Sequence, residues 1–384
     1  MAVGNKKICI FSAQYLPNVG GVERYTYNLS KKLVQKGVDV TIVASNTHQS
    51  LDFEQKEGIR IYRVPCINLM GGRFPVVIYN KKCRKLLKPL KSEKYDLVIT
   101  NTRFYFHSLL GVSFGKKHAE KSIVIEHGTS HLSVHNKVMD AMERVFEHGI
   151  TMIVKALCKD YYGVSEACNE WLKHFHIRAK STLYNAIDID QIRELSQQKK
   201  DDFFHTLGLP EDAKIVAFSG RVLPEKGIVE LLEAFNKVKE KHPELYLVIA
   251  GEGPLLPEVK EKKYDRVVLL GQIPFENVVN VLSYAHVFCL PSVSEGMPTS
   301  VLEAIACKCF VITTARGGAK EIIKNKNYGI IIPDNTVKNI TKSLEAVLND
   351  ENYRKQAVEE SYHALIEKFT WDQVADKVIE IMKR

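Results

Sequence analysis

Short runs of apolar residues recur along the chain, and a stretch with the spacing of an amphipathic helix separates each run from the next. Val- and Ile-rich runs that alternate with helices are typical of parallel β-sheets covered by helices on both faces. The first half predicts strands at residues 8–13, 38–45, 59–64, 97–100, 123–126 and 161–165. The second half predicts strands at residues 215–219, 246–250, 267–270, 287–290, 311–314 and 330–332. Two such sets predict an α/β chain with two doubly wound, Rossmann-like domains.

The break between the two domains is expected where residues 184–190 give way to a polar helix and a charged stretch. We therefore predict one domain over residues 1–186 and a second over residues 187–367. A last helix, at about 371–383, must pack against another surface because it carries an apolar stripe at Trp371, Val374, Val378 and Ile381. Ligands of such sheets bind beyond the carboxyl ends of the strands, so functional residues are expected just after the predicted strands.

The composition fits a soluble globular protein, with 45% apolar and 26% charged residues. No apolar run has the length of a membrane span, and the apolar stretch near the start continues as a strand, so no signal peptide is expected. The eight cysteines include Cys9, Cys158, Cys289 and Cys307 in or beside apolar patterns, which indicates buried free thiols in a reducing cytoplasm. The pair Cys307 and Cys309 lacks the spacing of a zinc site.

The net charge of +9 lies in the first half, where Lys and Arg are nearly twice as frequent as Asp and Glu. The excess is concentrated at Lys81, Lys82, Arg84, Lys85, Lys88, Lys91 and Lys94, with Lys116, Lys117 and Lys121 beyond. One interpretation is a solvated helix face. The other is docking to an anionic membrane, where each basic side chain adds about 1 kcal/mol. A nucleic-acid partner is not expected, because the chain has no aromatic-interleaved basic motif.

Two carboxylates eight residues apart, Glu295 and Glu303, flank a loop-to-helix junction in the second half. Gly296 frees the loop backbone, and Pro298 suits the start of a helix. The amides at the start of a helix can hold an anion, whereas carboxylates accept hydrogen bonds from hydroxyl groups. The combination suggests a ligand that is part phosphate and part polyol, as a nucleotide sugar is. The alternative is a loop with two solvated glutamates.

Two further turns carry residues suited to a phosphate ligand. Gly20 and Gly21 follow the first strand, where paired glycines let the backbone approach a bulky anion. They do not form the Gly-x-Gly-x-x-Gly fingerprint, so a nicotinamide enzyme is weakly supported. Arg221 and Lys226 follow the first strand of the second half, and two such cations can neutralise a diphosphate leaving group without a metal.

Two patterns of histidine and aspartate could indicate a metal site. His127 follows a predicted strand, and the i, i+4, i+8 spacing of His127, His131 and His135 could form a metal stripe. No His-Glu-x-x-His pattern accompanies it, so we expect no metal there. The pattern Asp188-Ile-Asp190 matches that of metal-dependent sugar transferases, but its place at the domain junction favours a structural role.

In combination these motifs resemble those of the GT-B-fold glycosyltransferases, specifically the large retaining family 4. The motifs that occur in the family's order are the turn at residues 20–24, the strand end at 126–128, the linker at 184–188, the segment 220–227 and the pair Glu295 and Glu303. The linker has Asn-Ala where Asn-Gly is common. The resemblance implies two Rossmann-like domains facing a central cleft, with residues about 368–384 returning to the first, acceptor-binding domain. It also implies a metal-independent, retaining hexosyltransferase with no cofactor beyond its nucleotide-sugar substrate.

The resemblance assigns roles to individual residues. Catalysis would rest on His127, Arg221, Lys226 and Glu295. The nucleotide sugar would be bound by Gly20, Gly21, Gly296, Met297, Pro298, Thr299 and Glu303. Arg221 and Lys226 would grip the diphosphate, Glu295 would hold the hydroxyls of the sugar and Glu303 would hold the ribose.

The expected partners are a nucleotide-sugar donor, with UDP preferred on family frequency, and a glycan or lipid-linked acceptor. The function would be the building of a surface polysaccharide or glycolipid by a cytoplasmic protein at the inner face of the cell membrane. Three alternatives stay open: a soluble transferase making a small glycoside, a catalytically silent partner protein of the same fold, and a nucleotide-sugar epimerase. Residues 103–107 and 129–131 follow no decipherable pattern, so the sequence leaves the acceptor open, along with the sugar, the linkage and the oligomeric state.

Overall fold

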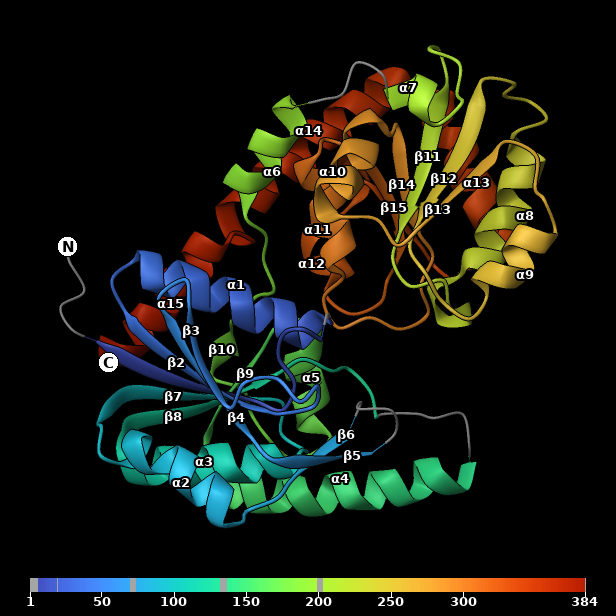
Figure 1. Ribbon diagram of the computed structural model, residues 1–384. Helices are drawn as coiled ribbons and strands as arrows, with labels where there is room; N and C mark the ends of the chain where they lie inside the picture. The colour runs from blue at the N-terminus through green and yellow to red at the C-terminus, as the bar shows by residue number, and fades with distance from the viewer. Residues whose placement is uncertain (1–5, 19, 70–73, 132–136, 199–202, 384) are drawn as a thin grey trace. The chain divides into compact units, whose positions relative to one another are not determined.

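The computed structural model describes residues 6–18, 20–69, 74–131, 137–198 and 203–383. Contacts divide the chain into two units, Met1–Asn185 with Trp371–Arg384 and Ala186–Thr370. The chain thus leaves the first unit one residue before the predicted break and returns to it at Trp371. Each unit contains a sheet of mainly or wholly parallel strands, with helices on both faces (Figure 1).

The sheet of the first unit has the strand order β10-β9-β8-β7-β1-β2-β4-β3. Its strands are β1 (Lys7–Ser12), β2 (Asp39–Ser45), β3 (Phe53–Lys56), β4 (Ile59–Val64), β7 (Tyr95–Asn101), β8 (Ala119–Glu126), β9 (Asp160–Gly163) and β10 (Ser181–Thr182). All neighbours pair in parallel except β3, which runs antiparallel to β4 at the edge. A separate antiparallel hairpin joins β5 (Cys66–Leu69) to β6 (Phe74–Val77).

The helices of the first unit cover both faces of this sheet. They are α1 (Gly21–Gln35), α2 (Lys81–Lys91), α3 (Phe106–His118), α4 (Lys137–Leu157), α5 (Glu166–Lys173) and α15 (Trp371–Lys383). Helices α2, α3 and α4 lie on one face and α1 and α15 on the other (Figure 1). On the first of these faces, Phe11 of β1 and Val98 of β7 pack against Leu87 of α2 and Phe114 of α3. Burial of such side chains stabilises the unit by about 1.5–3 kcal/mol each.

The last helix of the chain, α15, packs on the first unit. The Trp371 ring meets the Tyr25 ring edge-on, with the ring centres 5.2 Å apart. Asp372 forms ion pairs with Lys32 at 2.9 Å and with Lys36 at 3.3 Å, and both lysines belong to or adjoin α1. The apolar stripe that the sequence indicates on this helix is therefore buried against α1 and its neighbours.

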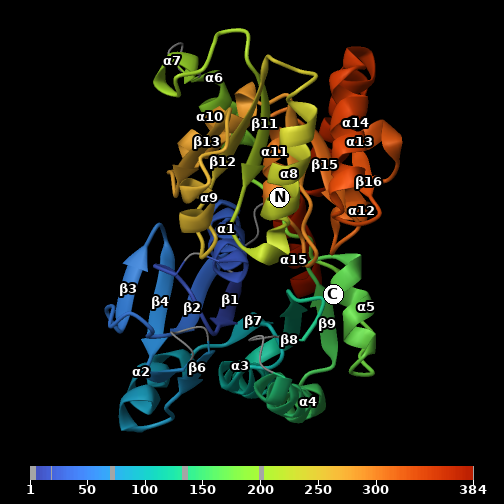
Figure 2. The same cartoon turned by 90° about the vertical axis from the view of Figure 1, so that its right-hand side faces the viewer.

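The sheet of the second unit is parallel, with the order β13-β12-β11-β14-β15-β16. Its strands are β11 (Lys214–Ser219), β12 (Leu245–Ala250), β13 (Val267–Gly271), β14 (Val287–Leu290), β15 (Phe310–Thr314) and β16 (Ile330–Ile332). Its helices are α6 (Ile189–Gln197), α7 (Phe203–Thr206), α8 (Ile228–Val238), α9 (Leu256–Glu261), α10 (Phe275–Tyr284), α11 (Thr299–Ala306), α12 (Ala319–Ile322), α13 (Val337–Leu348) and α14 (Glu351–Lys368), with 3-10 turns at Pro224–Lys226 and Lys326–Tyr328. Helices α8 and α13 lie on one face of the sheet, and α10 and α11 lie on the other (Figures 1 and 2).

All twelve predicted strands are present, and their ends agree within about two residues except at β8, which begins earlier, at Ala119. The short strands β3, β5, β6 and β10 were not predicted, because they lack a long apolar run.

Asp188 caps α6 by accepting a hydrogen bond from the Gln191 amide at 3.1 Å, in keeping with the structural role predicted for it. All eight cysteines are free thiols, and seven of them are buried. Within the part of the chain that the structure describes, no helix is long and apolar enough to cross a bilayer.

Candidate active site

The strand order of the second unit reverses between β11 and β14, where the chain changes the direction in which it builds the sheet. Open α/β sheets bind ligands at such a switch point, just beyond the carboxyl ends of the strands. The loop after β11 carries Arg221 and Lys226, and the loop after β14 carries Glu295. These three predicted residues therefore follow the two strands that flank the switch point.

The loop that carries Arg221 is held by backbone contact with the loop after β12. The Val222 amide donates a hydrogen bond to the Glu252 carbonyl at 2.9 Å. A Cβ atom on Gly251 would lie 1.8 Å from the Gly220 carbonyl oxygen, and a Cβ on Gly253 would lie 2.3 Å from the carbonyl oxygen of Val222. Only glycine permits this approach. The Arg221 side chain is exposed, so it is accessible to a ligand.

The 3-10 turn that contains Lys226 packs against the loop after β14. Gly227 has φ of 70°, and a Cβ there would lie 2.2 Å from the Pro291 carbonyl oxygen. The Val293 amide also donates to the Glu225 carbonyl at 2.9 Å. The two loops are thus in contact through their backbones. Their side chains also form an ion pair, because Lys226 Nζ lies 2.6 Å from Glu295 Oε1, with 21% and 11% of the two side chains exposed.

Glu295 leads directly into the start of α11. Pro298 is the residue before the helix, in extended conformation, and the first amides of the helix have no partner within it. Gly317 packs against the loop from the other side, where a Cβ would lie 2.2 Å from the Gly296 carbonyl oxygen. Glu303 belongs to α11 and is buried. The second unit therefore combines an ion pair, an exposed arginine, a helix N-terminus and a buried carboxylate.

Gly20 and Gly21 lie in the first unit, at the start of α1. Gly21 has open space where a Cβ would stand, but a Cβ on Gly20 would lie 2.5 Å from Glu23 Oε2. Burial raises the pKa of the Glu23 carboxyl group. The predicted anion site at these glycines therefore has an acidic side chain as its neighbour, which the glycine pattern alone did not indicate.

His127, also in the first unit, is held in one orientation by a chain of hydrogen bonds. Its Nε2 lies 3.0 Å from Asn101 Oδ1, the Asn101 amide donates to the Thr26 hydroxyl at 2.8 Å, and that hydroxyl donates to the Val22 carbonyl at 2.7 Å. The direction of this network assigns the proton to Nε2 and leaves Nδ1 as an acceptor. Burial lowers the pKa of His127 to about 3, so the ring is neutral at pH 7.

His127 and His131 do not form the metal stripe that their spacing suggested. They follow β8 in a loop rather than a helix, so residues four apart do not share a face. His135 lies outside the described residues. His131 instead approaches Glu147 of α4.

Arg103, for which the sequence offered no interpretation, is fully buried and forms ion pairs with Glu126 and Glu147. Its guanidinium also lies 3.9 Å from the centre of the Phe175 ring. The other oxygen of Glu126 accepts hydrogen bonds from the amides of His127 at 3.1 Å and Gly128 at 3.0 Å. This buried cluster therefore anchors the loop that carries His127.

Two protein-family models match the chain and between them span nearly all of it. The model "Glycosyltransferase Family 4" matches residues 19–191, and the model "Glycosyl transferases group 1" matches residues 199–364. The chain belongs to the group 1 glycosyltransferases. It is an enzyme of this class, as the motifs in both halves of the sequence predict.

Relatives and solved structures match this glycosyltransferase along its whole length. An uncharacterized glycosyltransferase of Methanocaldococcus jannaschii is 23% identical over 393 residues, 98% of each chain. A component of the phosphatidylinositol N-acetylglucosaminyltransferase of Homo sapiens is 26% identical, over 98% of this chain and 76% of the relative. The structure of Anabaena HepE in complex with UDP has a TM-score of 0.75 at 15% identity, covering 99% of both chains. The fold is accordingly GT-B, with two Rossmann-like domains.

Proposed function

We propose that this glycosyltransferase transfers a sugar from a UDP-sugar, with retention of configuration and without a metal, to a glycan or lipid-linked acceptor in the building of a surface polysaccharide or glycolipid. The observation that carries the proposal is the Lys226–Glu295 ion pair at the N-terminus of α11. It places a cation for phosphate next to an acceptor for sugar hydroxyl groups.

In this proposal the donor diphosphate contacts Lys226, Arg221 and the first amides of α11. Lys226 is already oriented by Glu295, so little reorganisation is needed when the phosphate binds. Glu295 would accept hydrogen bonds from the transferred sugar, and Glu303, deeper in α11, from the ribose. The acidic character of both residues suits hydroxyl groups and not phosphate.

The proposed reaction breaks the bond between the anomeric carbon and the diphosphate oxygen, and the bonding electrons leave with the diphosphate. The acceptor hydroxyl forms the new bond from the same face, and its proton passes to the departing phosphate oxygen. Two cations and a helix N-terminus stabilise the negative charge that develops on the diphosphate. His127 and the amides of Gly20 and Gly21 are proposed to contact the donor from the first unit. Because the His127 ring is neutral, it would form a hydrogen bond with the donor without adding a positive charge.

The choice of uridine is supported by Anabaena HepE, which has been solved with UDP and, in a second structure, with UDP-glucose. A lipid-linked acceptor is supported by the human relative, whose name is that of a transferase acting on phosphatidylinositol. A catalytically silent role is disfavoured, because Arg221, Lys226, Glu295 and Glu303 are all present.

Replacing Glu303 with glutamine is expected to weaken UDP binding about tenfold or more, the scale of losing a hydrogen bond to a charged group. Calorimetric titration of UDP measures the dissociation constant. Glu359→Gln is the matched control, because Glu359 lies exposed on α14 of the same unit. An unchanged UDP affinity in a folded Glu303→Gln protein would contradict the ribose role.

The first unit carries a surface suited to an anionic membrane. Helix α4 exposes an apolar stripe at helical spacing, with Val138 at 70%, Met142 at 69%, Val145 at 75% and Met152 at 70% exposure. Ile150 and Val154, on the other side of the helix, are buried. Helix α2, on the same face of the sheet, exposes Lys81, Lys82, Arg84, Lys85, Lys88 and Lys91 (Figure 1). Apolar insertion together with basic side chains is the chemistry of peripheral membrane binding.

We expect the protein to bind vesicles that contain phosphatidylglycerol at low salt and to lose much of this binding at high salt. The double change Lys85→Glu and Lys88→Glu should weaken binding about tenfold or more, since each basic side chain contributes about 1 kcal/mol. Met142→Asp with Val145→Asp should also weaken vesicle binding, because it places two charges in the apolar stripe of α4. Cosedimentation with vesicles measures the binding of both double variants. Lys241→Glu with Lys308→Glu, in the second unit, changes the net charge equally and should have little effect. Absence of vesicle binding at low salt would favour the alternative, a small soluble acceptor.

A further inference from the structure

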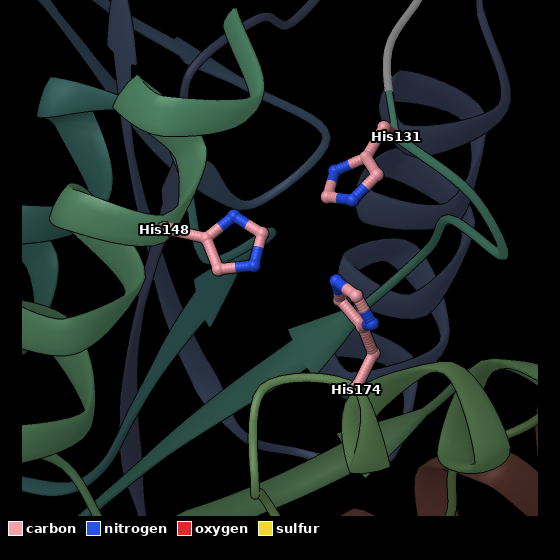
Figure 3. A group of neighbouring side chains, drawn as sticks. All are labelled: His131, His148 and His174. Carbon is pink, nitrogen blue, oxygen red and sulfur yellow. The ribbon is translucent and has the colours of Figure 1, made fainter. Parts of the chain in front are cut away.

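Three histidines of the first unit converge from separate elements. His131 lies in the loop after β8, His148 lies on α4, and His174 caps the end of α5. Their ring centres are 5.1–5.4 Å apart, and one ring nitrogen of each lies within 4.8 Å of those of the other two. Figure 3 shows the three rings grouped around a common space. None of the three histidines is among the residues assigned to the donor.

The hydrogen bonds around two of the rings assign their protons. His148 Nδ1 lies 2.8 Å from the Arg144 carbonyl oxygen, which can only accept, so this nitrogen carries the proton. His131 Nδ1 lies 2.5 Å from Glu147 Oε2, which as a carboxylate also accepts. In both residues Nε2 is therefore the nitrogen whose lone pair is available to a metal. A histidine that donates to a carboxylate or a carbonyl through its other nitrogen is typical of metal ligands.

The charge around the cluster also suits a cation. Arg103 is buried between Glu126 and Glu147, and these three groups together carry one net negative charge. Glu147 links this charge to the cluster, because its second oxygen contacts His131. The His174 ring is stacked on Trp171, with ring centres 4.9 Å apart and planes within 4° of parallel. Two of the three ligands are thus held in place by neighbouring side chains.

We propose that His131, His148 and His174 bind a zinc ion, with a water molecule as the fourth ligand. Zinc prefers imidazole nitrogens at 2.0–2.1 Å in tetrahedral arrangement, which places the nitrogens about 3.3 Å apart. Closing the group from a spread of up to 4.8 Å requires small rotations, chiefly of His148, which is exposed. Other transition metals that favour imidazole, such as Ni²⁺ and Cu²⁺, could compete for the site.

A metal bound here would connect the loop after β8, which contains both His127 and His131, to α4 and α5. It would fix this loop at His131 and hold it to α4, the helix with the exposed apolar stripe. The role is structural, and it is compatible with a donor site that uses no metal, because none of the three ligands is assigned to the donor.

The test uses the full chain without an affinity tag, stripped with EDTA and titrated with Zn²⁺ against a chromophoric chelator. We expect one ion per chain. His148→Ala and His174→Ala should each weaken binding at least tenfold, because either change leaves two imidazole ligands. His363→Ala, in the second unit, is the matched control and should bind as the wild type does. Both test residues are exposed, and melting temperatures without metal verify that each variant is folded.

X-ray absorption of the zinc-loaded protein identifies the ligand atoms. Imidazole nitrogens give a first shell at about 2.0 Å, whereas thiolate sulfur gives one at about 2.3 Å. The proposal is supported if the wild type shows the nitrogen shell and the double variant His148→Ala with His174→Ala lacks it. A sulfur shell, or equal Zn²⁺ affinity in the wild type and this double variant, would overturn the proposal.

Discussion

Replacing Lys226 with alanine is expected to lower the turnover of the glycosyltransferase by about 10²-fold or more, the scale of losing one preorganised electrostatic contact. In the proposed reaction Lys226 stabilises the charge that develops on the departing diphosphate. The effect should therefore appear in turnover at saturating UDP-sugar and not only in donor affinity. The ion pair with Glu295 is lost as well, so the group that orients the transferred sugar also loses its partner at 2.6 Å.

Release of UDP from saturating donor, with a lipid extract as the source of acceptor, measures this turnover. Lys241→Ala is the matched control: Lys241 also forms an ion pair with a glutamate of the second unit, Glu345 at 2.7 Å, but it is exposed and lies between the end of α8 and the start of β12. Near-native turnover in Lys226→Ala, with the control unchanged, would remove Lys226 from the mechanism.

Replacing Arg103 with methionine is expected to destabilise the first unit by about 3–5 kcal/mol, the cost of breaking a buried ion pair by removing one partner. Arg103 is fully buried, and its loss leaves the carboxylates of Glu126 and Glu147 in the interior without their cation. Methionine fills much of the same volume, so the effect reports charge more than packing.

Tryptophan fluorescence isolates this effect, because the chain has two tryptophans, Trp171 and Trp371, and both belong to the first unit. With a urea dependence of about 2 kcal/mol per M, the unfolding midpoint should fall by about 2 M. Arg178→Met, at an exposed position of the same unit, should change stability by no more than about 0.5 kcal/mol. A midpoint for Arg103→Met equal to that of this control would show that the buried cluster does not stabilise the unit.

Much of the fold was predictable, because burial on both faces of a parallel sheet demands long runs of Val, Ile and Leu. Strands such as β1 and β12 stand out for this reason. Strand β3, with the sequence Phe-Glu-Gln-Lys, does not, because it is an exposed edge strand paired on one side. Strand β10 is too short to show any periodicity.

Arg221, Lys226 and Glu295 could be selected from the sequence, because each follows a strand and adjoins a glycine that marks a turn. Their roles in donor binding stay predictions. The pairing of Lys226 with Glu295 was not predictable. Lys226 and Glu295 are separated by 69 positions, and they meet only because β11 and β14 are neighbours in the sheet. The backbone contacts at Gly227, Gly251 and Gly317 depend on the same tertiary arrangement.

The histidine cluster shows the limit of reasoning from local spacing. His127, His131 and His135 suggested a stripe because a helical period was assumed in a segment whose described part is a loop. The group formed by His131, His148 and His174 has no short-range pattern, since its members come from a loop and two helices. Arg103 could not be interpreted from sequence for the same reason: its partners Glu126 and Glu147 lie far along the chain.

The most direct test of the proposed donor site is a calorimetric titration of UDP, GDP and ADP into the wild-type protein in the presence of EDTA. We predict that UDP binds with one site per chain, more tightly than GDP or ADP, and that added Mg²⁺ or Mn²⁺ leaves its affinity unchanged. Binding of none of the three nucleotides to the folded protein, or binding only when a divalent metal is supplied, would contradict the metal-free donor site.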